Sequence, residues 1–283
     1  MVEGGSAEDL GAVLGATEVE ELGGGYQSRA FRIVLGDGST AVAKVFDATT
    51  VDRAELDARL GVCSALADAD PRVCRPLPVD GEVVAVIGAG RAYVVCFEYA
   101  DGRAPDPSDA ADAARMGTEL ATLHGSLRHV PVTRLPLVAT LQRASAETLS
   151  LGGAIQLLHG DFHAGNLRLG PAGLRIFDLD DCGYGPPAFD VANALYMVQF
   201  DSIVEGTPAV YDSFERSFLP AYARTRGEVV PTAVLTHFID RRVDALARWI
   251  DDLASAPVGI RTSSPEWLAT LRAFVETYRS APR

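Results

Sequence analysis

Lysine is almost absent from this sequence of 283 residues, since Lys44 is the single lysine among 25 basic side chains and arginine supplies all the others. Basic residues are in turn outnumbered by 38 acidic residues, which gives a formal net charge of −13. Phosphate backbones are bound by basic surfaces. The charge balance therefore argues against nucleic acid as a partner.

Long apolar runs are also lacking. No segment of about 18 apolar residues occurs, and a membrane-spanning helix requires such a run. Residues 1–5 show no basic region followed by an apolar block, so we expect no secretory signal and no membrane partner. The four cysteines form no C-x-x-C pair and no metal-site spacing. These absences predict a folded, soluble, cytoplasmic protein with reduced and mostly buried thiols.

The residues most suited to chemistry lie between positions 157 and 181. Asp161 and Asn166 share one short loop, and Asp178 follows an apolar run directly after it. Phosphoryl transfer needs a carboxylate that can accept the proton of the attacking hydroxyl, together with hard oxygen ligands for Mg²⁺. Asp161 is suited to the first role, and Asn166 with Asp178 to the second. The spacing predicts a magnesium-and-phosphate site.

The order of these residues resembles that of a known family. Residues 159–166 read H-G-D-x-x-x-x-N, which is similar to the catalytic loop of aminoglycoside phosphotransferases and the related choline-kinase-like enzymes. Residues 176–180 stand where that family has its second metal-binding aspartate, and residues 185–192 resemble its G-x-P-x-x-D-[LV]-A continuation. Three ordered matches make the resemblance specific.

The resemblance implies an α+β, bilobal protein-kinase-like fold. Residues 1–100 would form a small N-terminal antiparallel β lobe with one main helix, and residues 101–283 a larger, mostly helical C-terminal lobe. ATP would be the co-substrate, bound between the lobes, and Mg²⁺ the metal. The acceptor would bind in the second lobe.

Lys44 is the most informative residue of the first lobe. It lies in Val-Ala-Lys-Val, within a predicted strand, and arginine cannot replace a compact ammonium that must reach between two phosphates. The resemblance places Lys44 on the nucleotide phosphates and Gly25 and Ser28 above them. It also assigns an acidic partner to Lys44, for which Glu55 is preferred and Asp57 competes.

Other positions are implied with less detail. Backbone groups near Glu98 and Ala100 would bind adenine, because this segment corresponds to the family's hinge. His159 is expected to support the metal-binding segment and Asp190 to bind the backbone of the catalytic loop. The roles of three further residues are left open, namely His163, Asp180 and Asp181.

The pattern of apolar residues predicts the elements around these sites. Strands are expected at 26–34, 40–46, 75–78, 83–87 and 93–97, and a helix at 109–127 with Ser108 as its cap. The apolar runs 155–158 and 174–177 should form a two-stranded ribbon joined by the Gly-Pro-Ala-Gly turn at 170–173. A short helical stretch is expected near 137–149, and helices follow Asp190 to the end.

The regulation of the protein and its acceptor follow less directly from the sequence. Only eleven residues separate Asp178 from Asp190, which leaves no room for a long regulated loop, so we expect activity without prior phosphorylation. A small-molecule hydroxyl is the first choice of acceptor. Features such as 163–166 and 178–181 resemble bacterial stress-response kinase A, which makes protein Ser/Thr the alternative. A non-catalytic pseudokinase is the further alternative. ATP or GTP preference and oligomeric state are open.

Overall fold

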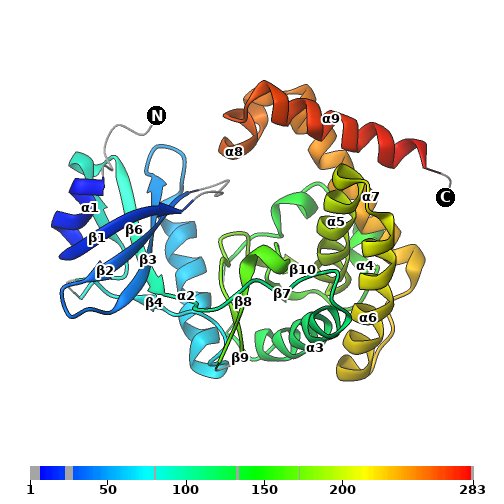
Figure 1. Cartoon of the computed structure of the whole chain (residues 1–283), viewed down its shortest axis with the longest axis horizontal. Helices are drawn as coiled ribbons and strands as arrows, with labels where there is room; N and C mark the ends of the chain where they lie inside the picture. Colours follow the sequence, from blue (N-terminus) through cyan, green and yellow to red (C-terminus); the bar gives the residue numbers. More distant parts are fainter. Residues whose placement is uncertain (1–6, 23–27, 80, 132–133, 172, 282–283) are drawn as a thin grey trace. The chain divides into compact units, whose positions relative to one another are not determined.

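The computed structural model describes residues 7–22, 28–79, 81–131, 134–171 and 173–281. The chain divides into two compact units (Figure 1). Unit 1 comprises Met1–Asp101 with Pro131–Arg134, and unit 2 comprises Gly102–Val130 with Leu135–Arg283. Among the residues described, no helix is both long and apolar enough to cross a membrane.

Unit 1 is built on an antiparallel sheet in which the strand order is β1-β2-β3-β6-β4 and β5 also pairs with β6. Its strands are β1 (Ala16–Leu22), β2 (Arg29–Leu35), β3 (Thr40–Asp47), β4 (Pro76–Leu77), β5 (Ala85–Ile87) and β6 (Ala92–Glu98). The apolar pattern predicts β2, β3 and β6 but gives no sign of β1. This edge strand carries exposed Glu18, Glu20 and Glu21, so it lacks a continuous apolar face.

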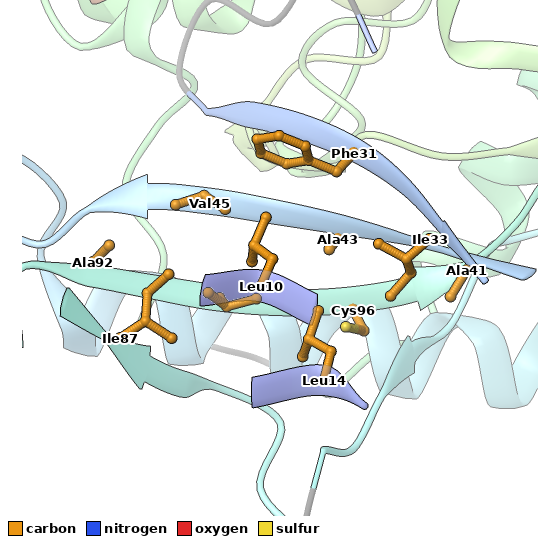
Figure 2. Close-up of a cluster of buried hydrophobic side chains, with 11 residues drawn as sticks. Leu10, Leu14, Phe31, Ile33, Ala41, Ala43, Val45, Ile87, Ala92 and Cys96 are labelled. Carbon is orange, nitrogen blue, oxygen red and sulfur yellow. The ribbon is translucent and has the colours of Figure 1, made fainter. Parts of the chain in front are cut away.

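The core of unit 1 lies on both faces of the sheet. On one face, Leu10 and Leu14 of α1 (Ala7–Leu14) point onto the strands, where Figure 2 shows them with Phe31, Ile33 and other buried side chains. On the other face, α2 (Arg53–Ala69) packs Leu56 and Leu60 against a second cluster, completed by Phe46, Val84 and Val95. Each such buried side chain stabilises the fold by about 1.5–3 kcal/mol.

Two short ribbons form the β structure of unit 2. β7 (Gln156–Leu158) pairs with β10 (Gly183–Gly185), and β8 (Leu167–Gly170) pairs with β9 (Gly173–Ile176). The predicted ribbon is therefore wrong in its pairing, because residues 174–176 pair with 167–170 and not with 155–158. A hairpin between adjacent runs closes the shorter loop and costs less chain entropy. Residues 156–158 find their partner later in the chain.

Helices make up the rest of unit 2. They are α3 (Ala110–Leu127), α4 (Ala146–Ser150), α5 (Ala188–Glu205), α6 (Pro208–Arg226), α7 (Thr232–Asp251), α8 (Val258–Arg261) and α9 (Pro265–Ser280). The predicted cap of α3 is one residue off. Asp109 accepts from the backbone N–H groups of Ala111 at 2.8 Å and Asp112 at 2.9 Å, whereas the Ser108 hydroxyl donates to Asp106 at 2.7 Å.

Helix α5 is the element on which the site depends. Its first nine residues, Ala188 to Tyr196, are all buried, and α6, α7 and α9 pack around it. α3 lies close against α6, where a Cβ on Gly117 would come within 2.2 Å of the Phe218 carbonyl oxygen. Prolines stand at the first positions of α6 and α9, where a proline removes no helical hydrogen bond.

Candidate active site

The loop after β7 is held by Asp190, on the first turn of α5. The carboxylate of Asp190 accepts from the backbone N–H groups of His159 and Gly160, each at 2.9 Å. His124 Nε2 lies 3.1 Å from the same carboxylate, and His124 Nδ1 lies 2.9 Å from the Tyr222 hydroxyl. A carboxylate accepts, so Nε2 carries the imidazole proton and Nδ1 accepts from Tyr222. The predicted backbone role of Asp190 is confirmed.

Gly160 occupies a position that only glycine fits. Its φ of +87° lies in the left-handed region, and a Cβ placed there would come within 2.1 Å of the Asp181 carbonyl oxygen. The backbone around Asp161 is thereby fixed against the segment that follows Asp178. A bulkier residue at position 160 would displace one or the other.

His159 joins the loop to the segment that ends in Asp178. Its Nε2 donates to the carbonyl oxygen of Phe177 at 3.1 Å, and its Nδ1 accepts from the N–H of Asp161 at 3.3 Å. Burial lowers the pKa of His159, which keeps the fully buried ring neutral. The supporting role predicted for His159 is confirmed, because the ring binds the residue directly before Asp178.

The carboxylate of Asp161 is surrounded by donors. Asn193 Nδ2 lies 3.3 Å and Arg242 Nη2 3.4 Å from its Oδ1, and His163 Nε2 lies 3.4 Å from its Oδ2. Burial by itself would raise the pKa of Asp161, but His163, Arg242 and His159 together hold that pKa below its usual range. Asp161 is therefore ionised and ready to accept a hydrogen bond from a hydroxyl.

His163 has an assigned place in this arrangement. The N–H of Gly165 donates to His163 Nδ1 at 3.0 Å, so in the neutral ring the proton sits on Nε2, which faces Asp161. Taking up a second proton on Nδ1 would break the bond to Gly165. The geometry thus favours His163 as a donor to Asp161 over a proton shuttle.

Asn166 and Asp178 are brought together by the β8–β9 hairpin. The register pairs Leu167 with Ile176, and the N–H of Phe177 donates to the Asn166 carbonyl at 3.1 Å. The buried Asn166 amide donates from Nδ2 to the Asp161 carbonyl at 2.9 Å, which leaves its Oδ1 as the side-chain acceptor. Together with the Asp178 carboxylate, this is a hard oxygen donor set that suits Mg²⁺.

Asp178 has an unusual backbone. Its φ is +66°, and it is the one residue other than glycine with positive φ in the described part of the chain. Such a conformation costs about 1–3 kcal/mol and persists only where the surroundings impose it. Here the His159 ring holds the preceding carbonyl. Among its neighbours, Asp181 is half-buried, and desolvation, followed by the charge of Asp161, raises the pKa of Asp181 to about 6.

In unit 1, Lys44 lies within β3 opposite Val95 of β6, and its exposed fraction is 7%. Strand residues alternate between faces, which puts Lys44 on the same face as Phe46, towards α2. Its Nζ is 5.8 Å from the centre of the Phe97 ring. Ser28 is half-buried directly before β2, whereas Gly25 lies outside the described residues.

The remaining predicted positions of unit 1 have defined contacts. The Glu55 carboxylate pairs with Arg59, and that of Asp57 pairs with Arg53 at 2.9 Å, both within α2. A Lys44 pair with Glu55 or Asp57 thus stays a prediction. The N–H of Glu98 donates to the Arg75 carbonyl at 2.9 Å, and the half-buried Ala100 follows two residues later.

Three residues of the site escape prediction from the sequence. Asn193 follows Asp190 by three positions within α5, but no motif marks it. Arg242 lies 81 positions after Asp161 and Tyr222 lies 98 after His124, so only the packing of α6 and α7 brings them in.

The fold and site together define a phosphotransferase of the protein-kinase-like class. The sequence model of the phosphotransferase enzyme family (APH) matches residues 18–151 and 135–227. The chain belongs to this family, and the predicted α+β fold with an antiparallel sheet and a larger helical part is confirmed. No curated protein matches the sequence.

Solved structures of the same fold include three kinases at 18% identity. The amicoumacin kinase hAmiN, in complex with AMP-PNP, Ca²⁺ and Ami, has a TM-score of 0.69 over 91% of this chain and 86% of that one. The microcompartment-associated aminopropanol kinase has a TM-score of 0.67 over 97% of each chain. The aminoglycoside phosphotransferase APH(3'')-Id from Streptomyces rimosus ATCC10970 has a TM-score of 0.58 over 83% and 95%.

Proposed function

We propose that this phosphotransferase moves the γ-phosphoryl group of ATP to a hydroxyl of a small-molecule acceptor, with Mg²⁺. The observation that carries the proposal is the coupling of Asp161 to Asn166. The Asn166 amide donates to the Asp161 carbonyl, and the backbone of Asn166 accepts from Phe177, next to Asp178. One loop and one hairpin thereby hold a carboxylate base and two oxygen ligands as a unit.

Asp161 is the group that would receive the acceptor hydroxyl. The oxygen of the hydroxyl forms a bond to the γ-phosphorus, the bond from that phosphorus to the β–γ bridging oxygen breaks, and the hydroxyl proton passes to Asp161. The products are a phosphomonoester and ADP. An aspartate held ionised is a weak base, so its contribution is largely to orient the hydroxyl.

Asn166 and Asp178 would hold the metal through Oδ1 and the carboxylate. When bound, Mg²⁺ neutralises charge on the phosphate oxygens. His159 and the Asp190 carboxylate keep this segment in place from behind, because one binds the Phe177 carbonyl and the other two N–H groups of the loop. The strained Asp178 backbone is a cost that this support offsets.

The nucleotide would be bound by residues of unit 1. Lys44 would contact the phosphates, with Glu55 as its acidic partner and Gly25 and Ser28 above the phosphates. Adenine would be recognised by backbone groups at Glu98 and Ala100. Because the Glu98 N–H already donates to Arg75, the Glu98 carbonyl is the group suited to the adenine amino group.

The names of several related structures support a small acceptor. They are kinases or phosphotransferases for amicoumacin, aminopropanol, hygromycin B and spectinomycin, and some of these structures contain AMP-PNP or ADP. We extend that acceptor class to this chain as a proposal. A cytoplasmic location, where ATP is at hand, belongs to the same proposal.

The test is acceptor-dependent conversion of ATP to ADP by the purified protein at increasing Mg²⁺. The acceptor panel should include aminoglycosides, amino alcohols, hydroxy acids and a casein-like protein. We expect a small molecule to be phosphorylated, and we expect Asp178→Ala to abolish the response to Mg²⁺. Phosphorylation of the casein-like protein, and of no small molecule, would favour the Ser/Thr kinase alternative. ATP binding without transfer to any acceptor would favour the pseudokinase.

A further inference from the structure

Arg242 is a basic side chain fixed next to the proposed catalytic base. It lies in the middle of α7, with Nη2 3.4 Å from Asp161 Oδ1. Its guanidinium carbon lies 5.2 Å from the centre of the Tyr196 ring on α5. Its side chain is 18% exposed. The stacking and the ion pair hold the guanidinium, while part of the side chain remains open to solvent.

An acceptor hydroxyl that reaches Asp161 must come close to Arg242. Asp161 Oδ1 is already approached by Asn193 and Arg242, and Oδ2 by His163. Guanidinium has five N–H donors in a planar fork, and the contact with Asp161 engages one nitrogen at a long distance. The fork is therefore able to bind a carboxylate or phosphate of a molecule whose hydroxyl lies at Asp161.

Acidic side chains also lie near Asp161. Asp178 would hold the metal in the proposed function, and Asp181 is half-buried. Asp201 of α5 is exposed, and partial desolvation, followed by the charge of Glu205, raises the pKa of Asp201. An ammonium group on the acceptor, placed beside its reacting hydroxyl, would lie near the positive charge of Arg242, whose Nη2 is 3.4 Å from Asp161 Oδ1.

We propose that Arg242 determines acceptor specificity, and that the acceptor carries an oxyanion, carboxylate or phosphate, near the hydroxyl that is phosphorylated. This inference rests on the proposed phosphotransfer to a small molecule. It separates this chain from related kinases that are named for amine acceptors, such as aminopropanol.

The experiment compares acceptors that share a diol and differ in one group: glycerate with a carboxylate, glycerol, and 3-amino-1,2-propanediol with an ammonium. Homologues with longer carbon chains and their phosphate counterparts extend the set. The measured quantity is the ratio of kcat/KM for the oxyanionic and the ammonium compound of each pair. The ratio cancels any loss of Asp161 positioning, because such a loss lowers both values alike.

We expect the wild-type protein to favour the oxyanion by about 10-fold or more. Arg242→Gln should lower that ratio by about 10-fold, and Arg242→Glu should reverse the preference. Arg248→Gln is the matched control, since Arg248 is exposed on the same helix, and it should leave the ratio unchanged. A ratio that is the same in wild type and Arg242→Gln would show that Arg242 only holds Asp161, and it would overturn the proposal.

A second readout does not depend on turnover. Binding of the same compounds without ATP is measured by calorimetry, and thermal unfolding confirms that each variant is folded. Selective binding of hydroxy acids by wild type, lost in Arg242→Gln, supports the proposal even if no phosphate is transferred. Lack of that selectivity overturns it, even if turnover with another acceptor establishes the phosphotransferase.

Discussion

The two units bury charge in different ways. In unit 1, the buried cation Lys44 sits in a sheet whose neighbouring strands place Ala30 and Val95 opposite it. In unit 2, the buried Asp190 is met by two backbone N–H groups and by His124. The proposed role of the first charge is to contact the nucleotide phosphates, whereas the second charge holds the loop in place. On that proposal, function and stability should separate in unit 1 and coincide around Asp190.

The largest effect is expected at Asp161, where Asp161→Asn removes the charge that receives the hydroxyl. We expect kcat to fall by about 10²–10⁴-fold. The free energy of unfolding should also fall, because His163 and Arg242 lose the carboxylate whose pKa they hold below its usual range. Steady-state kinetics and denaturant unfolding of the same preparation measure both. A variant that retains more than about a tenth of wild-type kcat would contradict the assigned role.

Asp190→Ala should lower activity nearly as much as Asp161→Asn does, and it should also lower the free energy of unfolding. It leaves the N–H groups of His159 and Gly160 and the proton of His124 without their acceptor in a buried place. We expect the free energy of unfolding to fall by about 3–5 kcal/mol, with loss of activity. Unfolding in urea measures the change. Tyr222→Phe removes only the donor to His124 and serves as the milder comparison.

Lys44→Met tests the expectation for unit 1, that function and stability separate there. We expect about a 100-fold loss of kcat/KM for ATP and a change in unfolding free energy within about 1 kcal/mol, because methionine keeps the apolar stem. Lys44→Arg should not restore activity, since the planar guanidinium does not fit where a compact ammonium binds. A large loss of stability in Lys44→Met would mean that Lys44 is needed for the fold of unit 1.

The pH dependence of stability should reveal two opposing groups in unit 2. The pKa of His159 is lowered on folding, so its contribution to stability is lost as the pH falls from about 6.5. The pKa of Asp181 is raised to about 6, so the folded state gains stability as the pH falls below that value. We expect the free energy of unfolding of Asp181→Asn to fall more steeply than that of the wild type as the pH is lowered. Urea unfolding between about pH 5 and 7.5, without Mg²⁺, measures it.

The smallest effect is expected in unit 1 at Gly61, which is exposed on α2 and has no atom within 4 Å of a built Cβ. Gly61→Ala should stabilise the protein by about 0.5–1 kcal/mol and leave activity unchanged. Thermal and urea unfolding measure the gain. A loss of stability would show that this part of α2 needs glycine for a reason that its open surroundings do not reveal.

Much of the fold and of the proposed site could be predicted, because the informative residues are close in sequence. Asp161 and Asn166 share a loop, and Asp178 follows one hairpin later, so spacing alone identified them. The helices of unit 2 followed from their apolar spacing. Arg242 could not be found in this way, because its place beside Asp161 depends on how α7 packs on α5, and no local pattern encodes that packing.

The errors have local physical causes. Ser108 was expected to cap α3, but Asp106 accepts both its N–H at 2.8 Å and its hydroxyl at 2.7 Å, so Asp109 takes the cap. The ribbon was paired wrongly because apolar runs show which residues are buried but not which strand they pair with.

The acidic strand β1 has a consequence for how molecules of this protein behave together. β1 ends the sheet on one side, and an edge strand offers unpaired backbone groups to any other extended chain. That edge carries charged side chains, since Glu20 and Glu21 form ion pairs with Arg32 and Arg29 of β2 and Glu18 is exposed. Another strand would have to displace water from these charges before backbone pairing can begin, so the residues that hid this strand from its sequence pattern also protect the sheet from aggregation.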